Sequence, residues 1–418
     1  MTGIKRLRIF GPGILLAAVS VGGSHMIMSP TAGAKYGFAL LWLVIFTHLF
    51  KYYAFEFGPR FAAAEKKSLL EGYAQVRGPK NWPLYLVLIN TTIEGISVVA
   101  AVISITASIL YASFHLISGA WWSVLIASSI VILLYTGKYK YLQNINKFMM
   151  LILAIGAVIA FFGAKPSLKI IPLLFKPSIP PGSEKLIAAI IGWMPTGVIV
   201  SVWHSLWFLE QRSIRKIQDK RRSLKEALTD MRVGYGLSMI LAFVFITLGA
   251  ILLNPLGEVP EGAQVAVTLS KLFTTILGEW MYPLFMLVAF FAMFSTSYTV
   301  MDGFPRTFGE AWRIIRGQKL DSPQQKPVAY WIFMGFLSIS ALIVIFVFKN
   351  RPVELVLVAG VITFLLSPVY YLLNYYCVTR LIKDKELRPN QINRMLAILG
   401  IIAMTFGSII YIYLQYIK

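Results

Sequence analysis

Two short stretches interrupt otherwise apolar sequence with glycine, proline and polar side chains. They read VSVGGSHMIMSP at residues 19–30 and IIGWMPTGV at residues 190–198. Glycine allows a ligand to approach the backbone closely, and hydroxyls, carbonyls and an imidazole can bind an ion or a small solute. The candidate substrate-binding residues are Ser20, Gly22, Gly23, Ser24, His25, Met194, Pro195 and Thr196.

A metal ion is one ligand that these stretches could bind. Imidazole and thioether groups suit softer transition-metal ions, so His25 and Met194 are the candidate metal ligands. A hard ion such as Mg²⁺ or Ca²⁺ prefers several oxygens, usually with a carboxylate, and the first stretch contains no carboxylate. A hydrogen bond to a neighbouring helix is the alternative role for His25. No resident cofactor is expected, because the chain has one cysteine, Cys377, and only four histidines.

Glu94 and His204 are the candidates for proton coupling, because both stand within apolar segments. Ionisable groups inside a membrane are costly and usually functional. Glu94, in NTTIEGIS, could accept a proton or could be a structural carboxylate bonded to Asn90 or a serine. His204, in WHSLW, could relay a proton, since histidine titrates near neutral pH, or could pack among tryptophans at the inner surface.

The composition indicates a membrane protein with many spans. The chain is 57% hydrophobic and only 14% charged, which is far from the balance of soluble domains. About 20 apolar residues can cross a bilayer as a helix. Residues 1–418 are therefore predicted to form one all-α transmembrane domain. Its eleven predicted spans are residues 10–34, 38–60, 83–111, 120–136, 146–164, 185–209, 232–253, 280–301, 328–348, 353–376 and 394–416.

Charge in the connecting segments predicts the orientation. With a cytoplasmic N-terminus, 29 of the 39 lysines and arginines lie in inner loops and nine in outer segments, as the positive-inside rule requires. Eleven spans then place the C-terminus outside, and the plasma (cytoplasmic) membrane is the expected location. These basic loops explain the net charge of +21, so no nucleic-acid partner is expected. The remaining cation, Lys51, could pair with Glu56 or Glu94, or extend to the inner surface.

The two interrupted stretches become equivalent if the spans form two halves of five. The first half covers residues 10–164, the second covers residues 185–376, and residues 394–416 add an eleventh helix. Since five is odd, the halves would have opposite orientations. Paired broken helices in inverted repeats are typical of a transporter's binding site. Ordinary kinks, which are common in membrane helices, are the alternative.

The first span also carries a specific spacing of short motifs. GPG at residues 11–13 is followed by eighteen residues, then by AGA at 32–34, YG at 36–37 and LW at 41–42. This spacing resembles the Nramp family of proton-coupled metal-ion transporters, as do TTIEGISVVAA in the third span and the MP and HS pairs in the sixth. The resemblance implies a LeuT-type fold with discontinuous helices 1 and 6. It also implies that Glu94 matches the glutamate of the family's proton route.

The departures from the family pattern fall on the metal site. Family transporters place Asp-Pro-Gly-Asn in the first break, and here those positions are Gly22-Gly23-Ser24-His25. In the sixth span the family has Met-Pro-His, whereas here Met194-Pro195 is followed by Thr196. The resemblance thus implies a proton-coupled symporter for a divalent metal ion, but with an altered site.

Two other functions stay open at this stage. Without the aspartate, a helix start after the first break would direct N–H groups at the cavity, which favours a small organic or anionic solute. A non-transporting sensor or structural homologue is the third possibility. An enzyme is not expected, because the sequence has no His-Glu-x-x-His, Gly-x-Ser-x-Gly or phosphate-loop motif. The expected partners are the lipid bilayer, protons and a small solute or ion.

Overall fold

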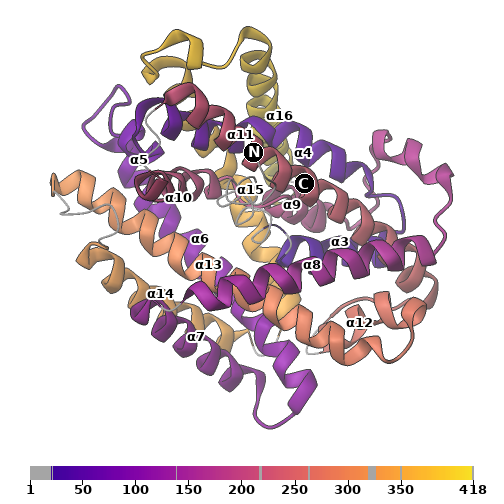
Figure 1. The fold of residues 1–418 in the computed structure, drawn as a ribbon. Helices are drawn as coiled ribbons and strands as arrows, with labels where there is room; N and C mark the ends of the chain where they lie inside the picture. The colour runs from indigo at the N-terminus through magenta and orange to yellow at the C-terminus, as the bar shows by residue number, and fades with distance from the viewer. Residues whose placement is uncertain are drawn as a thin grey trace, which may run out of the picture.

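The computed structural model describes residues 20, 22–137, 139–215, 219–261, 264–318, 326–348 and 351–416, and every regular element among them is helical (Figure 1). The α-helices are α3 (Ser29–Tyr36), α4 (Trp42–Glu65), α5 (Leu69–Tyr73), α6 (Trp82–Phe114), α7 (Gly119–Thr136), α8 (Tyr139–Gly163), α9 (Glu184–Trp193), α10 (Val200–Arg215), α11 (Lys220–Leu248), α12 (Val265–Leu277), α13 (Met281–Arg316), α14 (Val328–Val347), α15 (Pro352–Tyr376) and α16 (Gln391–Tyr416). The shorter π and 3₁₀ segments are η1 (Ser24–Met28), η2 (Leu168–Phe175), η3 (Gly249–Leu253), η4 (Asn254–Leu256), η6 (Cys377–Leu381) and η7 (Lys385–Leu387).

Ten of the eleven predicted spans coincide with one of these helices or with a broken pair. Of the first, residues 10–34, only residues 20 and 22–34 are described, and they contain η1 and α3; the GPG motif at residues 11–13 lies outside the described residues. Within the described residues, seven helices are long and apolar enough to cross a membrane, namely α6, α7, α11, α13, α14, α15 and α16. The later part of α8 and η2 would make an eighth, although they bend by 116° at the break between them. The other three predicted spans correspond to α4, which carries Lys51, Glu56 and Arg60, and to the two interrupted stretches.

Two helices differ from the sequence-based prediction, α13 in its length and α12 in being present at all. α13 continues to Arg316, well past the predicted end at residue 301, because a helix can extend beyond the apolar part of its sequence. α12 lies in a segment predicted to be a connector. It is short, but Val265, Leu269 and Leu272 recur at helical spacing and are buried against the rest of the chain.

The first interrupted stretch is a widened helical turn rather than extended backbone. Gly22 lies in a turn, and Ser24–Met28 form the π-helix η1, which continues directly into α3. Pro30 stands in the first turn of α3. The Ser24 hydroxyl donates to the carbonyl of Ser20 at 2.8 Å, and the Ser29 hydroxyl donates to the carbonyl of Ser24 at 3.0 Å. Hydroxyl groups thus supply part of the hydrogen bonding in this irregular turn.

The second interrupted stretch is a true break in the helix. α9 ends at Trp193 and α10 begins at Val200. Met194 has extended backbone angles, and Pro195 lacks the N–H group that would continue α9. The sixth span is therefore discontinuous, as the sequence predicted.

The helices pack so that both interrupted stretches, named the first and the second break from here on, lie inside the molecule. α6 packs along α13 and α15, α15 packs along α9, and α4 packs along α10, α11 and α16. α7 and α14 lie side by side at the lower left of Figure 1, and α16 lies at the upper edge. Residues 22–34 and 186–205 are buried in this arrangement.

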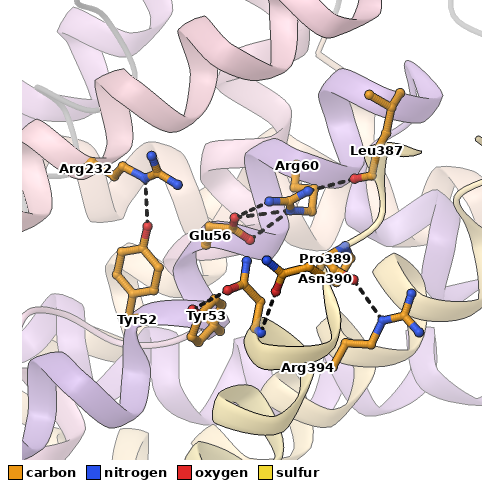
Figure 2. Close-up of polar contacts among 10 residues, drawn as sticks. Tyr52, Tyr53, Glu56, Arg60, Arg232, Leu387, Pro389, Asn390 and Arg394 are labelled. Atoms are coloured by element: carbon orange, nitrogen blue, oxygen red, sulfur yellow. Dashed lines mark hydrogen bonds and ion pairs between the residues drawn. The ribbon is translucent and has the colours of Figure 1, made fainter. Parts of the chain in front are cut away.

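A polar cluster joins α4 to the segment before α16 (Figure 2). Glu56 and Arg60, one turn apart on α4, form a buried ion pair with an N–O distance of 2.5 Å. Arg60 also donates to the carbonyl of Leu387 at 2.7 Å. The Tyr53 hydroxyl donates to the amide oxygen of Asn393 at 2.9 Å. These bonds attach α16 and the segment before it to α4.

Candidate functional site

A cavity lies between the two breaks, α6 and α13. Its polar groups come from Ser24, Glu94, Thr196 and Thr296, and its apolar wall includes Trp193, Trp203 and Phe304. About 30 Å³ is open to the centre of a water-sized sphere. Since one bound water needs on the order of 10–15 Å³ by this measure, the cavity fits an ion with a little water or a solute of very few atoms.

Ser24 connects the two breaks at the cavity. Its hydroxyl donates to the carbonyl of Ser20, and it also lies 3.3 Å from the carbonyl oxygen of Pro195 in the other break. Of the predicted substrate-binding residues, Gly23, Ser24 and Thr196 line the cavity. Ser20 and Pro195 contact the Ser24 hydroxyl instead.

The glycine pair is required by close packing. A Cβ atom on Gly22 would lie 2.4 Å from Oγ1 of Thr296, and one on Gly23 would lie 2.5 Å from the ring of Trp193. Both distances are far inside the van der Waals contact of about 3.5–4.0 Å. The two glycines therefore let the first break approach α13 and the end of α9, and this approach closes the cavity wall.

Glu94 is the carboxylate of the cavity, and a chain of donors orients it. The Thr363 hydroxyl of α15 donates to Glu94 Oε1 at 2.8 Å, and the Trp193 indole N–H donates to the Thr363 hydroxyl at 3.2 Å. The Asn90 amide lies 3.4 Å from Glu94 Oε2, the contact considered in the sequence. Glu94 is only 2% exposed. Gly197 lies close to the carboxylate, because a Cβ there would lie 3.0 Å from Glu94 Oε1.

His25 and Met194 do not meet at the cavity. Both His25 ring nitrogens are bonded: Nδ1 lies 2.7 Å from the Ser24 hydroxyl, and Nε2 lies 2.8 Å from the Ser238 carbonyl of α11. His48 Nε2 also reaches the Ser238 hydroxyl, at 3.3 Å. The Met194 side chain is fully buried outside the cavity wall. In this conformation His25 joins η1 to α11, and Ser238 of α11 is also contacted by His48 of α4. A hydrogen bond to a neighbouring helix is the alternative left open by the sequence.

His204 is buried next to the cavity but does not line it. It is 1% exposed, and neither ring nitrogen has a hydrogen-bond partner among the described residues. Its neighbour Trp203 lines the cavity and packs edge-on against Phe304 with ring centroids 4.9 Å apart. The structure therefore places Trp203, and not His204, in the cavity wall.

Lys51 takes none of the three environments proposed from the sequence. Glu56 pairs with Arg60, and no carboxylate among the described residues lies within ion-pair distance of Lys51. Its ammonium donates to four backbone carbonyls of the second break, at 2.7–3.0 Å. The side chain is fully buried rather than extended to the inner surface. The reason is that unpaired carbonyls at the end of α9 lie within its reach.

Three site residues were missed in the sequence: Thr296, Thr363 and Trp193. Thr296 belongs to a run of five hydroxyl-bearing residues, Ser295 to Thr299, within the apolar span of α13. Five consecutive hydroxyls in a membrane span are a signal that could have located this wall. Thr363 has no such signal, because its role depends on the packing of α15 against α6.

Three of the N–H groups at the helix starts near the cavity already have hydrogen-bond partners. After the first break, the Met26 N–H donates to the Gly22 carbonyl at 3.0 Å. At the start of α10, the N–H groups of Val200 and Ser201 donate to carbonyls three residues earlier, both at 3.0 Å. These three N–H groups are therefore not free to bind an anionic solute.

The donor set that remains suits a hard cation. The residues that line the cavity include one carboxylate residue, Glu94, and three residues that carry hydroxyls, Ser24, Thr196 and Thr296, but no histidine or methionine. Within the described residues, no group of three or more His, Cys, Asp or Glu side chains is arranged to hold a metal ion. A metal bound here would keep part of its water shell, as Mg²⁺ usually does.

Comparison with known proteins decides the family. Residues 13–416 match the family described as Natural resistance-associated macrophage protein-like. The chain is a member of the Nramp family. A similar protein from Pasteurella multocida (strain Pm70), itself described as uncharacterized, is 30% identical over 426 residues, which covers 98% of this chain and 92% of that protein. The resemblance drawn from the first-span motifs is thus confirmed, and this Nramp chain is a transporter rather than an enzyme.

Solved structures show the same architecture for this Nramp chain. A manganese transporter from Eremococcus coleocola superposes with a TM-score of 0.75 at 13% identity, covering 99% of this chain and 88% of that one. The transporter MhsT, solved in complex with L-phenylalanine, has a TM-score of 0.58 at 14% identity, with 96% and 97% covered. At these identities the likeness shows the fold alone. The predicted all-α, LeuT-type architecture of an integral membrane protein is confirmed.

Proposed function

We propose that this Nramp chain transports a hard divalent metal ion, bound between the two helix breaks with part of its water shell. The observation that carries the proposal is the Glu94 carboxylate on the cavity wall, oriented by Thr363 and Trp193. Hard cations prefer carboxylate, hydroxyl and carbonyl oxygens, and these are the donors around the cavity. The missing aspartate of the first break is thereby replaced by a carboxylate from the third span.

Glu94 is also our candidate for proton coupling. A buried carboxylate that can bind either a metal ion or a proton makes the two cargoes compete for one site, which is a simple basis for coupled transport. Glu94→Gln, which cannot titrate, is expected to reduce the pH dependence of transport. Unchanged proton coupling in that variant would remove Glu94 from the mechanism.

A small organic solute is the second candidate, because one observation favours it. Trp193, Trp203 and Phe304 give the cavity an aromatic wall, and the buried indole N–H of Trp203 has no partner among the described residues. Such a donor could bind a carbonyl or carboxylate group of a solute. The cavity of this conformation would have to widen to hold it.

A thermal-shift screen separates the two candidates, because a ligand that binds the folded state raises the melting temperature. The panel is Mg²⁺, Mn²⁺, Fe²⁺ and Co²⁺ against amino acids and organic acids, on purified protein. Our proposal expects concentration-dependent stabilisation by one or more divalent ions. Stabilisation by an organic solute alone would replace it with the second candidate.

A further inference from the structure

The ammonium of Lys51 occupies a cage of backbone carbonyls. Its Nζ lies 2.8 Å from the carbonyl oxygen of Ile191, 2.9 Å from that of Gly192, 3.0 Å from that of Met194 and 2.7 Å from that of Thr196. The side chain is fully buried, and the Phe55 ring lies 5.9 Å from Nζ. A single cation from α4 is therefore surrounded by oxygens of the second break.

The end of a helix explains why these oxygens are available. The last four carbonyls of an α-helix lack partners within the helix, and they form the negative end of its dipole. Ile191 and Gly192 belong to the last turn of α9, and Met194 and Thr196 follow in the break. Carbonyls that converge in this way replace the water shell of a monovalent cation in other membrane proteins. An ammonium group has three donors and a full positive charge, so it satisfies the same requirement.

We propose that Lys51 is a tethered monovalent cation, which takes the place of a bound ion and fixes the shape of the second break. By holding this backbone, Lys51 also affects the cavity, through two adjacent residues of the second break. Thr196, whose carbonyl accepts from Lys51, lines the cavity, and Gly197 lines it close to the Glu94 carboxylate. Lys51 is thus a positioning residue, which acts on Glu94 and Thr196 through the backbone that it holds. This inference goes beyond the proposed function, because it does not depend on which substrate is carried.

The experiment removes the Lys51 ammonium from the carbonyl cage and then adds free cations to the solution. Lys51→Ala removes the ammonium and opens space around the four carbonyls. Its melting temperature is measured in detergent with choline chloride, and again with choline replaced by methylammonium, Na⁺ or K⁺. We expect at least one small cation to raise the melting temperature of Lys51→Ala by about 2 °C or more, because a ligand that binds only the folded state stabilises it. The native chain, whose cage is filled, is expected to show no such response.

Two variants make the test specific. Lys51→Met keeps the volume of the side chain without its charge, so no cation can enter and no rescue is expected. Tyr53→Phe, on the same helix, loses only the bond to Asn393. Like the native chain, it is expected to show no rise in melting temperature when cations are added. Lys51→Ser, which leaves a smaller void, serves as the second variant if Lys51→Ala does not fold.

The proposal is overturned if no cation stabilises the emptied cage more than it stabilises the native chain. Equal rescue of Lys51→Met and Lys51→Ala would overturn it as well, because the cation would then act elsewhere. These measurements of the melting temperature do not use the transported substrate. Failure here would leave the proposed metal transport standing, and failure of metal transport would leave this test valid.

Discussion

At the scale of single residues, the site depends on how buried polar groups are held. Trp193 donates to Thr363, and Thr363 donates to Glu94, so the carboxylate is oriented by two helices other than its own. Ser24 contacts both breaks at once. Because unpaired polar groups are costly away from water, such chains fix the geometry of the cavity before a ligand arrives.

His25→Ala is expected to reduce stability rather than substrate affinity. The substitution removes a fully buried ring and leaves the Ser238 carbonyl without its 2.8 Å partner. Together these losses should lower the free energy of unfolding by about 2–4 kcal/mol. Thermal unfolding with and without a divalent metal ion such as Mn²⁺ or Mg²⁺ measures both effects. A loss of metal binding at unchanged stability would restore His25 as a ligand.

The chemistry of individual residues was only partly readable from the sequence. Glu94 was predicted because a charge is unusual in an apolar span, and Gly23, Ser24 and Thr196 because they stand in the interrupted stretches; all four line the cavity. His25 and Met194 have the right chemistry for a metal, but their environment depends on the direction in which each side chain leaves its helix. One sequence does not determine that direction at an irregular turn.

At the scale of elements, the two breaks were predictable and their conformations were not. The glycine pair and Pro195 predicted interruptions, which the structure contains. That η1 would be a π-helix, while residues 194–199 would lose helical structure, depends on tertiary packing against Thr296, Trp193 and Lys51. Pairing of distant segments of this kind leaves no local pattern in the sequence.

Glu56→Gln is expected to weaken the attachment of the α15–α16 connection to α4. Glu56 is fully buried, so its loss leaves the Arg60 guanidinium with an uncompensated charge. Breaking a buried pair in this way costs about 3–5 kcal/mol. The measurement is thermal unfolding, with limited proteolysis in the segment 382–390. Arg222→Gln, which breaks an exposed pair with Glu226, is the control and should change stability by less than about 1 kcal/mol. Equal effects of the two substitutions would contradict this assignment.

At the scale of the whole molecule, the all-α membrane fold with many spans followed from the composition and the lengths of the apolar segments, because the bilayer restricts spanning segments to long apolar helices. The count of eleven spans stays a prediction. The division into inverted repeats at residues 10–164 and 185–376 stays a prediction. The orientation, with the N-terminus in the cytoplasm and the C-terminus outside, also stays a prediction, based on the distribution of lysine and arginine.

Cysteine labelling tests the orientation in intact cells. Cys377 is the one cysteine and is buried, so Cys377→Ser gives a suitable background. Glu261→Cys, in the segment between α11 and α12, is expected to react with a membrane-impermeant maleimide from outside. Glu386→Cys, in the segment before α16, is expected to react only after permeabilisation. Both side chains are largely exposed in the folded chain, so burial does not bias the comparison. The reverse pattern would invert the predicted topology.

The most direct test of the account is metal uptake by Glu94→Gln in proteoliposomes. The native chain is expected to take up a hard divalent ion such as Mn²⁺ or Mg²⁺. Glu94→Gln should lower the apparent affinity by about tenfold or more, which corresponds to ~1.4 kcal/mol of binding energy. Ser97→Ala, one turn along α6, loses only bonds to backbone carbonyls and should transport as the native chain does. Uptake by Glu94→Gln that equals that of the native chain would contradict a metal site built on this carboxylate.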